Sequence, residues 1–182
     1  MYICGTIGFR PIDIQDLELL RGLHNEASTL LQLGNVDMVS SEEQVAWWKR
    51  LAGSERNKRY SLVEIASNQV VGMLRVQNIE QANGNCEIGL DILPSLRGRG
   101  YGRASYQCIL EYLFLHANMH MVYLKVGNFN ERALQLYKAL KFEQTGHFKE
   151  YLYRDGKYWD YLIMCMTRDV YFNNRGENES RR

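Results

Sequence analysis

"LPSLRGRGYGRASYQCILEYL", residues 93–113, joins an apolar strand to an amphipathic helix through a loop with three glycines. The run before it, "NCEIGLDIL", has the composition of a strand, and apolar residues recur at helical spacing from Ile109 to Phe114. A glycine-rich turn between a strand and a helix directs unpaired backbone N–H groups, and the positive end of the helix dipole, at one point. Such a point attracts phosphate, so the sequence predicts an anion site here.

The residues of the loop are suited to binding a phosphate. Because glycine has only a hydrogen atom in place of a side chain, a phosphate can approach the backbone closely at these positions. Some of the positions are also expected to need positive φ. Arg97, Arg99 and Arg103 could pair with phosphate oxygens that the backbone leaves unsatisfied. A flexible turn is the alternative that the glycines alone would leave open.

Two nucleotide-binding patterns do not fit this loop. A Walker loop needs lysine and then serine or threonine after its last glycine, whereas Gly102 is followed by Arg103 and Ala104. The dinucleotide pattern GxGxxG would need a glycine at Arg103 or at Ser105.

"RGRGYG", of the form R-x-x-G-x-G after a strand, resembles the pyrophosphate loop of the GNAT superfamily of acetyl-CoA-dependent N-acetyltransferases. A second segment, "LKVGNFNERALQLYKALKF" at 124–142, resembles the family pattern V-x-x-x-N-x-x-A-x-x-L-Y-x-x-x-G-F. The matching residues are Val126, Asn130, Ala133, Leu136, Tyr137 and Phe142. Lys141 departs from the pattern, where the family usually has glycine, and a left-handed lysine there would cost roughly 1 kcal/mol.

The resemblance implies acetyl-CoA as cosubstrate and no metal. It places the CoA pyrophosphate on the backbone of the glycine loop and the pantetheine arm along the preceding strand, in a gap where strands 86–93 and 121–126 splay apart. A backbone N–H of the first strand would donate to the developing oxyanion. The residues implied for the cofactor are Ile92, Leu93, Arg97, Gly98, Arg99, Gly100, Tyr101, Gly102 and Asn130.

Two residues are predicted to transfer protons. A tyrosine with a pKa near 10 is protonated at neutral pH, so the resemblance makes Tyr137 the general acid for the leaving thiolate; packing on its helix is the alternative. Glu87, on the strand that carries the thioester, is the candidate base, and an ordinary solvated glutamate is the alternative. Asn130 contacts the pantetheine region or caps its helix.

The remaining patterns predict an α+β domain at residues 1–169. Its expected order is strand, two helices, three strands, helix, strand, helix and two strands, with a GNAT-like mixed, mostly antiparallel sheet flanked by about four helices. Ser40 and Glu43 form a capping box before one helix, and Asp155-Gly156 suits a two-residue hairpin turn. Residues 170–182 are polar and without periodicity, and are expected to be a disordered tail.

Composition restricts the partners. The 22 basic and 21 acidic residues nearly balance, so no charge excess indicates nucleic acid, and no apolar run approaches the roughly 20 residues that cross a membrane. The four cysteines share no spacing with a metal site, which favours free thiols in the cytoplasm. Assembly into a homo-oligomer stays open.

The acceptor is expected to be a small-molecule or peptide amine that attacks directly in a ternary complex. The layout resembles the GNAT branch with ribosomal-protein N-terminal, spermidine and amino-sugar-nucleotide N-acetyltransferases. Mixed charge in the first two helices favours an anionic acceptor such as a nucleotide-linked amino sugar. The alternatives are a polyamine, a protein N-terminus, or a non-catalytic acyl-CoA sensor. The aromatic residues expected near the acceptor are Trp47, Trp48, Tyr60, Tyr151, Tyr153, Tyr158, Trp159 and Tyr161, about half of them packing in the sheet.

Overall fold

The computed structural model describes residues 1–179, with side chains up to residue 176, as eight strands and six α-helices. The elements in chain order are β1 (Tyr2–Cys4), β2 (Ile7–Pro11), α1 (Leu17–Asn25), α2 (Ala27–Leu30), α3 (Ser41–Leu51), β3 (Lys58–Glu64), β4 (Gln69–Glu80), β5 (Asn85–Ile92), α4 (Tyr101–Glu111), β6 (Met121–Gly127), α5 (Glu131–Ala139), β7 (Glu143–Arg154), β8 (Lys157–Thr167) and α6 (Arg168–Glu179). One π-helical turn, Tyr112–His116, continues α4.

The strands form one sheet in the order β1-β2-β3-β4-β5-β6-β8-β7, antiparallel at every pair except β5 and β6. The predicted α+β class and mixed sheet are therefore confirmed. The crossover through α4 makes β6 parallel to β5, as the strand-helix-strand pattern predicts.

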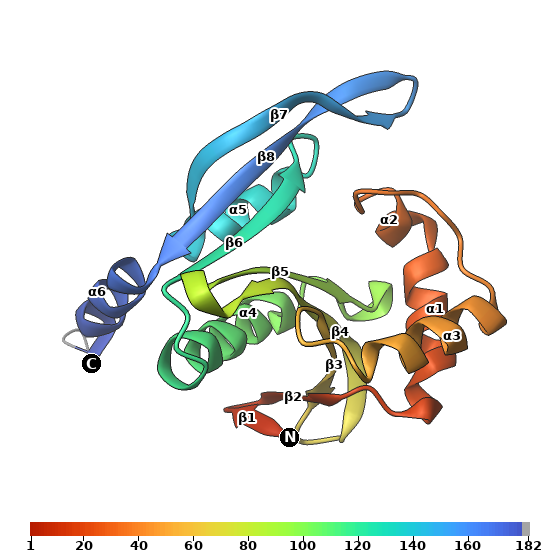
Figure 1. The fold of residues 1–182 in the computed structure, drawn as a ribbon, viewed down its shortest axis with the longest axis horizontal. Coiled ribbons are helices and arrows are strands. Elements are labelled where there is room, and N and C mark those ends of the chain that lie inside the picture. The colour runs from red at the N-terminus through yellow and green to blue at the C-terminus, as the bar shows by residue number, and fades with distance from the viewer. Residues whose placement is uncertain (180–182) are drawn as a thin grey trace.

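The two parallel strands separate after three residues. Pairing joins Asn85–Glu87 to Met121–Tyr123 only, although β5 runs on to Ile92 and β6 to Gly127. The predicted splay is thus present. The gap opens beside the end of β5 that leads into the glycine loop (Figure 1).

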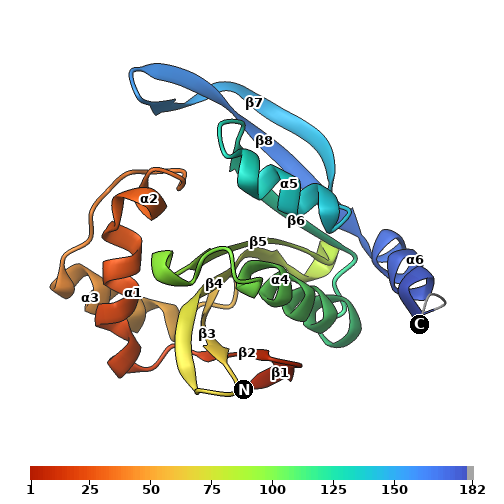
Figure 2. The same cartoon turned by 180° about the vertical axis from the view of Figure 1, so that it is seen from behind.

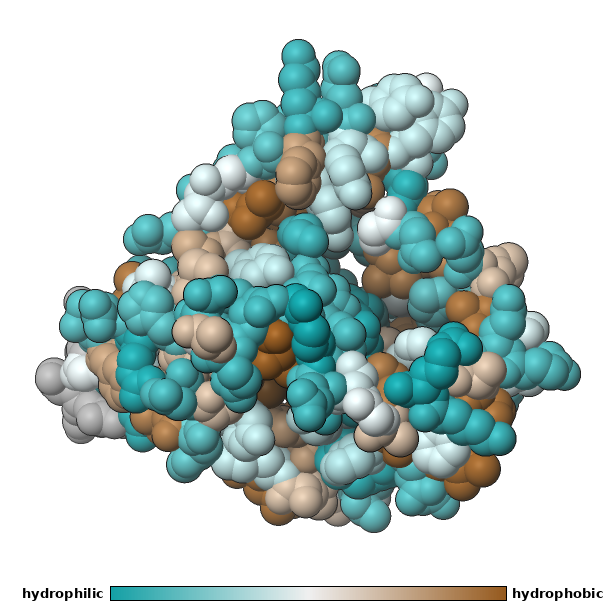
Figure 3. All heavy atoms as spheres, in the orientation of Figure 1, coloured by the Kyte–Doolittle hydropathy of each residue, from teal (hydrophilic) through white to brown (hydrophobic). Residues whose placement is uncertain are grey.

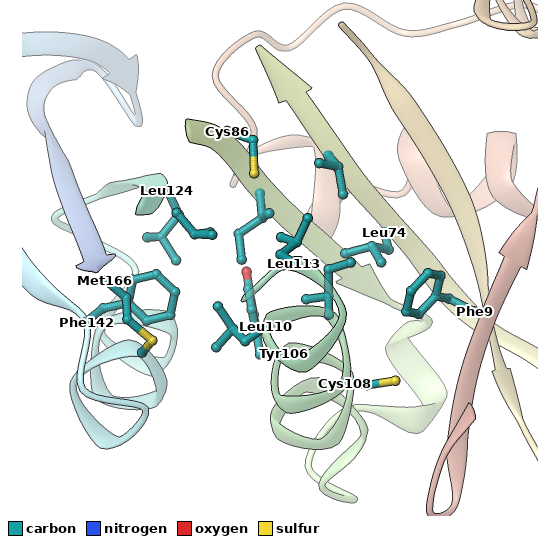
Figure 4. Close-up of a cluster of buried hydrophobic side chains, with 14 of the residues drawn as sticks. Phe9, Leu74, Cys86, Tyr106, Cys108, Leu110, Leu113, Leu124, Phe142 and Met166 are labelled. Atoms are coloured by element: carbon teal, nitrogen blue, oxygen red, sulfur yellow. The ribbon is translucent and has the colours of Figure 1, made fainter. Parts of the chain in front are cut away.

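Helices cover the two faces of the sheet differently. α4 and α5 lie side by side on one face (Figure 2), where Leu74 of β4 and Leu124 of β6 pack against Tyr106 and Leu110 of α4 (Figure 4). The opposite face of β4 presents Met73, which packs with the leucines of α1 and with Trp48 of α3. Strand alternation therefore separates an apolar core from the face that α1 and α3 cover only at one end.

Some elements differ from the sequence expectation. The first strand is preceded by β1, a four-residue α2 follows α1, and the expected tail at 170–182 is helical as far as Glu179. Stacking of Tyr171 on Phe114, with ring centroids 4.9 Å apart, stabilises this polar helix. The part of the predicted tail at 180–182 lies outside the described residues.

The two predicted local signals are present. The Ser40 side chain accepts from the Glu43 N–H and the Glu43 carboxylate accepts from the Ser40 N–H, so the capping box at the start of α3 is confirmed. Asp155 and Gly156 have φ of 52° and 77°, the left-handed pair that a tight hairpin turn requires.

Lys141, after the end of α5, has φ of 72°. Lys141→Gly should raise the free energy of unfolding by roughly 0.5–1 kcal/mol, because relieving the left-handed strain outweighs the added entropy of the unfolded chain. Denaturant unfolding measures this change. Lys138→Gly in the last turn of α5 is the matched control, and it should lower stability because a helical lysine becomes glycine; equal effects at both sites would contradict the prediction.

Candidate active site

A cavity of about 1020 Å³ lies on the face of the sheet that α1–α3 cover only in part. It is visible as a hollow between the β7–β8 hairpin at the top and the α1–α3 side at the right of Figure 3. Its walls come from α1, α3, the segment between them and the hairpin, and its floor from β3–β6. The predicted site residues that line it are Glu87, Asn130 and Tyr137.

The backbone of β5 has an open edge beside this cavity. The Leu93 N–H donates to the Val71 carbonyl of β4 at 2.9 Å. Because the backbone groups of successive residues in an antiparallel strand point to opposite sides, those of Leu90 and Ile92 point away from β4, toward the splayed β6. The predicted contact of the pantetheine arm with Ile92 fits this edge, whereas the backbone of Leu93 is turned to β4. The residues whose backbone groups face the gap are therefore Leu90 and Ile92, and not Ile92 and Leu93.

The glycine loop has the backbone that the sequence predicts. Gly98 and Gly100 have φ of 85° and 88°, and Gly100 is the N-cap of α4. The first N–H groups of an α-helix have no partner within the helix, so those at the start of α4 face outward at the loop. Tyr101 begins α4, and its hydroxyl donates to the Glu64 carboxylate of β3, which fixes the loop to the sheet.

Arg97 has a different role from the one expected. Its Nε donates to the Ile92 carbonyl at 3.0 Å, and its two Nη atoms donate to the hydroxyls of Ser28 and Thr29 of α2. The side chain is directed at α2 and at β5, so it positions the loop against the wall of the cavity, which corrects the expectation that it pairs with phosphate oxygens. From the hairpin, Arg154 donates to the Leu31 and Leu33 carbonyls after α2.

The exposed cations near the loop are Arg99, Arg103 and a residue that the sequence analysis missed, Arg132 of α5. An Nη atom of Arg132 lies 3.8 Å from the point where a Cβ on Gly98 would stand. The helical spacing of Arg132 from Asn130 predicts that it is on the first turn of α5. That Arg132 lies close to the glycine loop, which precedes α4, follows only from the packing of α4 beside α5.

Tyr137 projects from α5 into the cavity. Its hydroxyl lies 3.0 Å from that of Tyr106, and the two rings meet edge to face with centroids 5.3 Å apart. Burial raises the pKa of Tyr137, although the Tyr106 hydroxyl and Arg75 act in the opposite direction. The phenol therefore stays protonated at neutral pH.

Glu87 is a buried carboxylate on β5. Its Oε1 accepts from Gln77 Nε2 at 3.1 Å, and its Oε2 accepts from Asn78 Nδ2 at 2.9 Å and pairs with Lys125 Nζ at 3.0 Å. It is not the ordinary solvated glutamate of the alternative interpretation. Each carboxylate oxygen can accept about two hydrogen bonds, so Oε1 keeps capacity for a further donor.

Asn130 is the N-cap of α5, where its Oδ1 accepts from the Ala133 N–H at 3.1 Å. Of the two roles left open by the sequence, the structure shows the cap. The residue also borders the cavity.

Comparison with known proteins adds to this geometry. The sequence profile of the Acetyltransferase (GNAT) family matches residues 22–142, which include the glycine loop, β5 and α5. The chain belongs to the GNAT family. Its reaction is acetyl transfer from acetyl-CoA to an amine nitrogen, as the loop and the second motif imply.

Individual GNAT relatives cover most of the chain. Spermidine N(1)-acetyltransferase of Vibrio cholerae is 25% identical over 90% of this chain and 94% of its own length. The alanine N-acetyltransferase of ribosomal protein uS5 of Escherichia coli is 22% identical over 59% of this chain and 56% of its own. The crystal structure of the Vibrio cholerae spermidine enzyme with CoA and spermine superposes with a TM-score of 0.87, at 23% identity over 93% of this chain and 100% of that one.

The aromatic residues expected around the acceptor divide into two groups in this GNAT fold. Trp47, Tyr151 and Tyr161 line the cavity, and the rings of the two tyrosines stack at 5.7 Å. Trp48 donates to the Ile12 carbonyl and packs with α1, while Tyr60 packs on Phe9. Tyr153 and Tyr158 pair with each other across the hairpin, near Trp159.

The described residues provide neither a metal site nor a membrane-spanning helix. Among the side chains of residues 1–176, no cluster of three histidine, cysteine, aspartate or glutamate residues is placed to hold a metal ion. In the same part of the chain, no helix has the length and apolar character needed to span a membrane.

Proposed function

We propose that this GNAT enzyme transfers the acetyl group to a primary amine by direct attack in a ternary complex. The observation that carries the proposal is the convergence of Leu90, Glu87 and Tyr137 on one cavity beside the splayed strands. An open strand edge, a hydrogen-bonding carboxylate and a protonated phenol are the groups that amine acetylation requires.

Acetyl-CoA would extend from the loop to the cavity along β5. Backbone N–H groups from Gly98 to Gly102 would bind the pyrophosphate, with Arg99 and Arg132 on its exposed side. The pantetheine amides would pair with the Ile92 N–H and with the second lone pair of the Ile92 carbonyl, which also accepts from Arg97, as an added strand. The Leu90 N–H would then donate to the thioester oxygen as it becomes negative.

The proton transfers use two different groups. The amine nitrogen forms a bond to the acetyl carbon and loses a proton to Glu87, directly or through water. As the carbon–sulfur bond breaks, the thiolate takes a proton from Tyr137. A thiol pKa near 8.5 lies below that of the phenol, so proton transfer from Tyr137 to the thiolate is unfavourable by itself. It depends on the position of the phenol and on the free energy released when the carbon–sulfur bond breaks.

The acceptor class remains part of the proposal. The name of the Vibrio cholerae relative supports a polyamine, and that of the Escherichia coli relative a protein N-terminus. Neither name supports the nucleotide-linked amino sugar that the sequence analysis favours. A homo-oligomer is supported by a structure described as dodecameric, of the Vibrio cholerae spermidine enzyme, with a TM-score of 0.80 at 22% identity over 94% of this chain and 99% of that one.

The experiment that tests the proposal is release of CoA thiol from acetyl-CoA with spermidine, an N-terminal peptide and amino sugars as acceptors. Initial rates with both substrates varied should give intersecting double-reciprocal lines, as a ternary complex requires. Parallel lines would indicate a covalent acetyl-enzyme instead. Binding of CoA without turnover of any amine would favour the non-catalytic sensor.

A further inference from the structure

A row of basic side chains crosses the floor of the cavity. Strand register places Arg59 of β3 opposite Arg75 of β4, and Arg75 opposite Gly89 of β5. Lys125 of β6 also lines the cavity on the far side of β5. Gly89 makes room for this row, because a Cβ there would stand 2.9 Å from an Nη atom of Arg75.

The carboxylates of the floor are already paired. Asp91 forms an ion pair with Arg75, and Glu87 forms one with Lys125. We use "cavity floor" for these four residues and Arg59. Its formal charge is three positive and two negative, so one cation, Arg59, has no acidic partner on it.

Arg59 binds only neutral acceptors in the described chain. One Nη donates to the Gln77 amide oxygen at 2.7 Å and the other to the Lys58 carbonyl at 3.1 Å, and Arg59 makes no ion pair within residues 1–176. Burial and the neighbouring Arg75 lower the pKa of Arg59 to about 10, and the charges of Glu87 and Asp91 oppose this shift. Partial burial of a guanidinium that has no carboxylate in contact carries a desolvation cost. An anionic ligand that accepted hydrogen bonds from Arg59 would offset this cost.

We infer that Arg59 binds an oxyanion of the acceptor, so that the acceptor is a primary amine carrying a carboxylate or a phosphate. This inference rests on the proposed acetyl transfer. Arg59 lies two strands from Gly89, the neighbour of Leu90, and strands are spaced about 4.8 Å apart. The anion is therefore within roughly 10 Å of the amine that reacts at the Leu90 N–H.

The rival ligand is a polyamine, whose ammonium groups need free carboxylates. The cavity rim provides two such carboxylates, Asp37 and Glu43, whose hydrogen-bond donors, the Asn35 amide and the Ser40 N–H, are neutral. A polycation that reached the floor would meet Arg59, and the two floor carboxylates already form ion pairs with Arg75 and Lys125. The floor at Arg59 therefore favours an anion, whereas the rim acids would attract an ammonium group, and the spermidine arm of the test separates the two.

The test uses probes that differ only in the anion. Glucosamine 6-phosphate is compared with glucosamine, 4-aminobutyrate with 4-aminobutanamide, and spermidine serves as the polycation. For each we would measure kcat/KM by thiol release in the wild type, Arg59→Gln, Arg59→Lys and Lys58→Gln. Lys58 is the matched control, since it is the exposed cation next along β3, on the opposite face.

The expected result is that the wild type prefers the anionic member of at least one pair. A charge-assisted hydrogen bond of about 1.5–3 kcal/mol corresponds to a preference of roughly 10- to 100-fold. Arg59→Gln should remove that preference while turnover of the neutral amine persists, Arg59→Lys should restore part of it, and Lys58→Gln should keep it. Whether phosphate or carboxylate binds follows from which pair shows the preference.

Three results would overturn the inference. One is a wild type that prefers spermidine or the neutral members of both pairs. Another is an Arg59→Gln enzyme with unchanged discrimination. The third is a loss of CoA affinity in Arg59→Gln by calorimetry, which would assign the guanidinium to the cosubstrate. Turnover of spermidine alone would leave the proposed acetyl transfer intact, whereas no turnover of any amine would remove both.

Discussion

Tyr137→Phe should lower kcat by about 100-fold or more, the usual contribution of a general acid, with CoA affinity unchanged. The substitution keeps the ring that packs edge to face on Tyr106 and removes the hydroxyl at the cavity, together with its hydrogen bond to the Tyr106 hydroxyl. Steady-state thiol release gives kcat, and calorimetry with CoA separates catalysis from binding.

The pH profile provides a second measurement on the same group. Because burial raises the pKa of Tyr137, the acid form persists above the ordinary tyrosine pKa of about 10. Loss of kcat below that pH should therefore not arise from this phenol. The profile of Tyr137→Phe should lie lower but have the same shape between pH 6 and about 10.

Tyr60→Phe is the matched control. Tyr60 is also a half-buried tyrosine whose pKa is raised by burial, but it packs on Phe9 and does not line the cavity. Its replacement should leave kcat within about twofold, since no proton transfer passes through it. A Tyr137→Phe enzyme as active as Tyr60→Phe would refute the assigned acid.

Gly100→Leu should weaken CoA binding by about 100-fold or more, because two backbone hydrogen bonds to phosphate at about 1.5 kcal/mol each would be obstructed. Gly100 has φ of 88°, and a Cβ there would meet nothing within 4 Å in the free protein. A side chain at this position is strained and projects into the space that the pyrophosphate would occupy.

Gly5→Leu separates strain from obstruction. Gly5 has φ of 63°, and a Cβ there also meets nothing within 4 Å, but it lies in the β1–β2 turn. Both variants should lose a similar amount of thermal stability, and only Gly100→Leu should lose CoA affinity. Equal CoA affinity in the two variants would show that the loop does not hold the pyrophosphate.

The local features of the fold could be predicted from the sequence. Residue spacing was sufficient for the capping box at Ser40, the hairpin turn at Asp155 and the left-handed glycines of the loop, because each depends on neighbours within a few residues. The helix α6 was missed because its order depends on Tyr171 stacking on Phe114, which is distant in sequence.

The site was predictable to a lesser extent. The motifs indicated the loop, Tyr137 and Glu87, but the pairing partners of β5 decide that Leu90 and Ile92, not Leu93, face the gap. The contact of Arg97 with Ser28 and Thr29 joins elements far apart in the chain. A basic residue beside glycines predicts a phosphate contact, and only tertiary structure shows that the side chain turns the other way.

The splay of β5 from β6 has a consequence for aggregation. A sheet normally has unpaired strand edges only at its two borders, where charged residues and bulges keep other chains from pairing. The splay adds two more inside the sheet, between β5 and β6, and the β7–β8 hairpin and the α1–α3 segment lie on either side of the opening (Figure 1). In the proposed complex the pantetheine arm, with its own amides, would pair with the edge of β5 and so occupy the place where a strand of another chain would otherwise add.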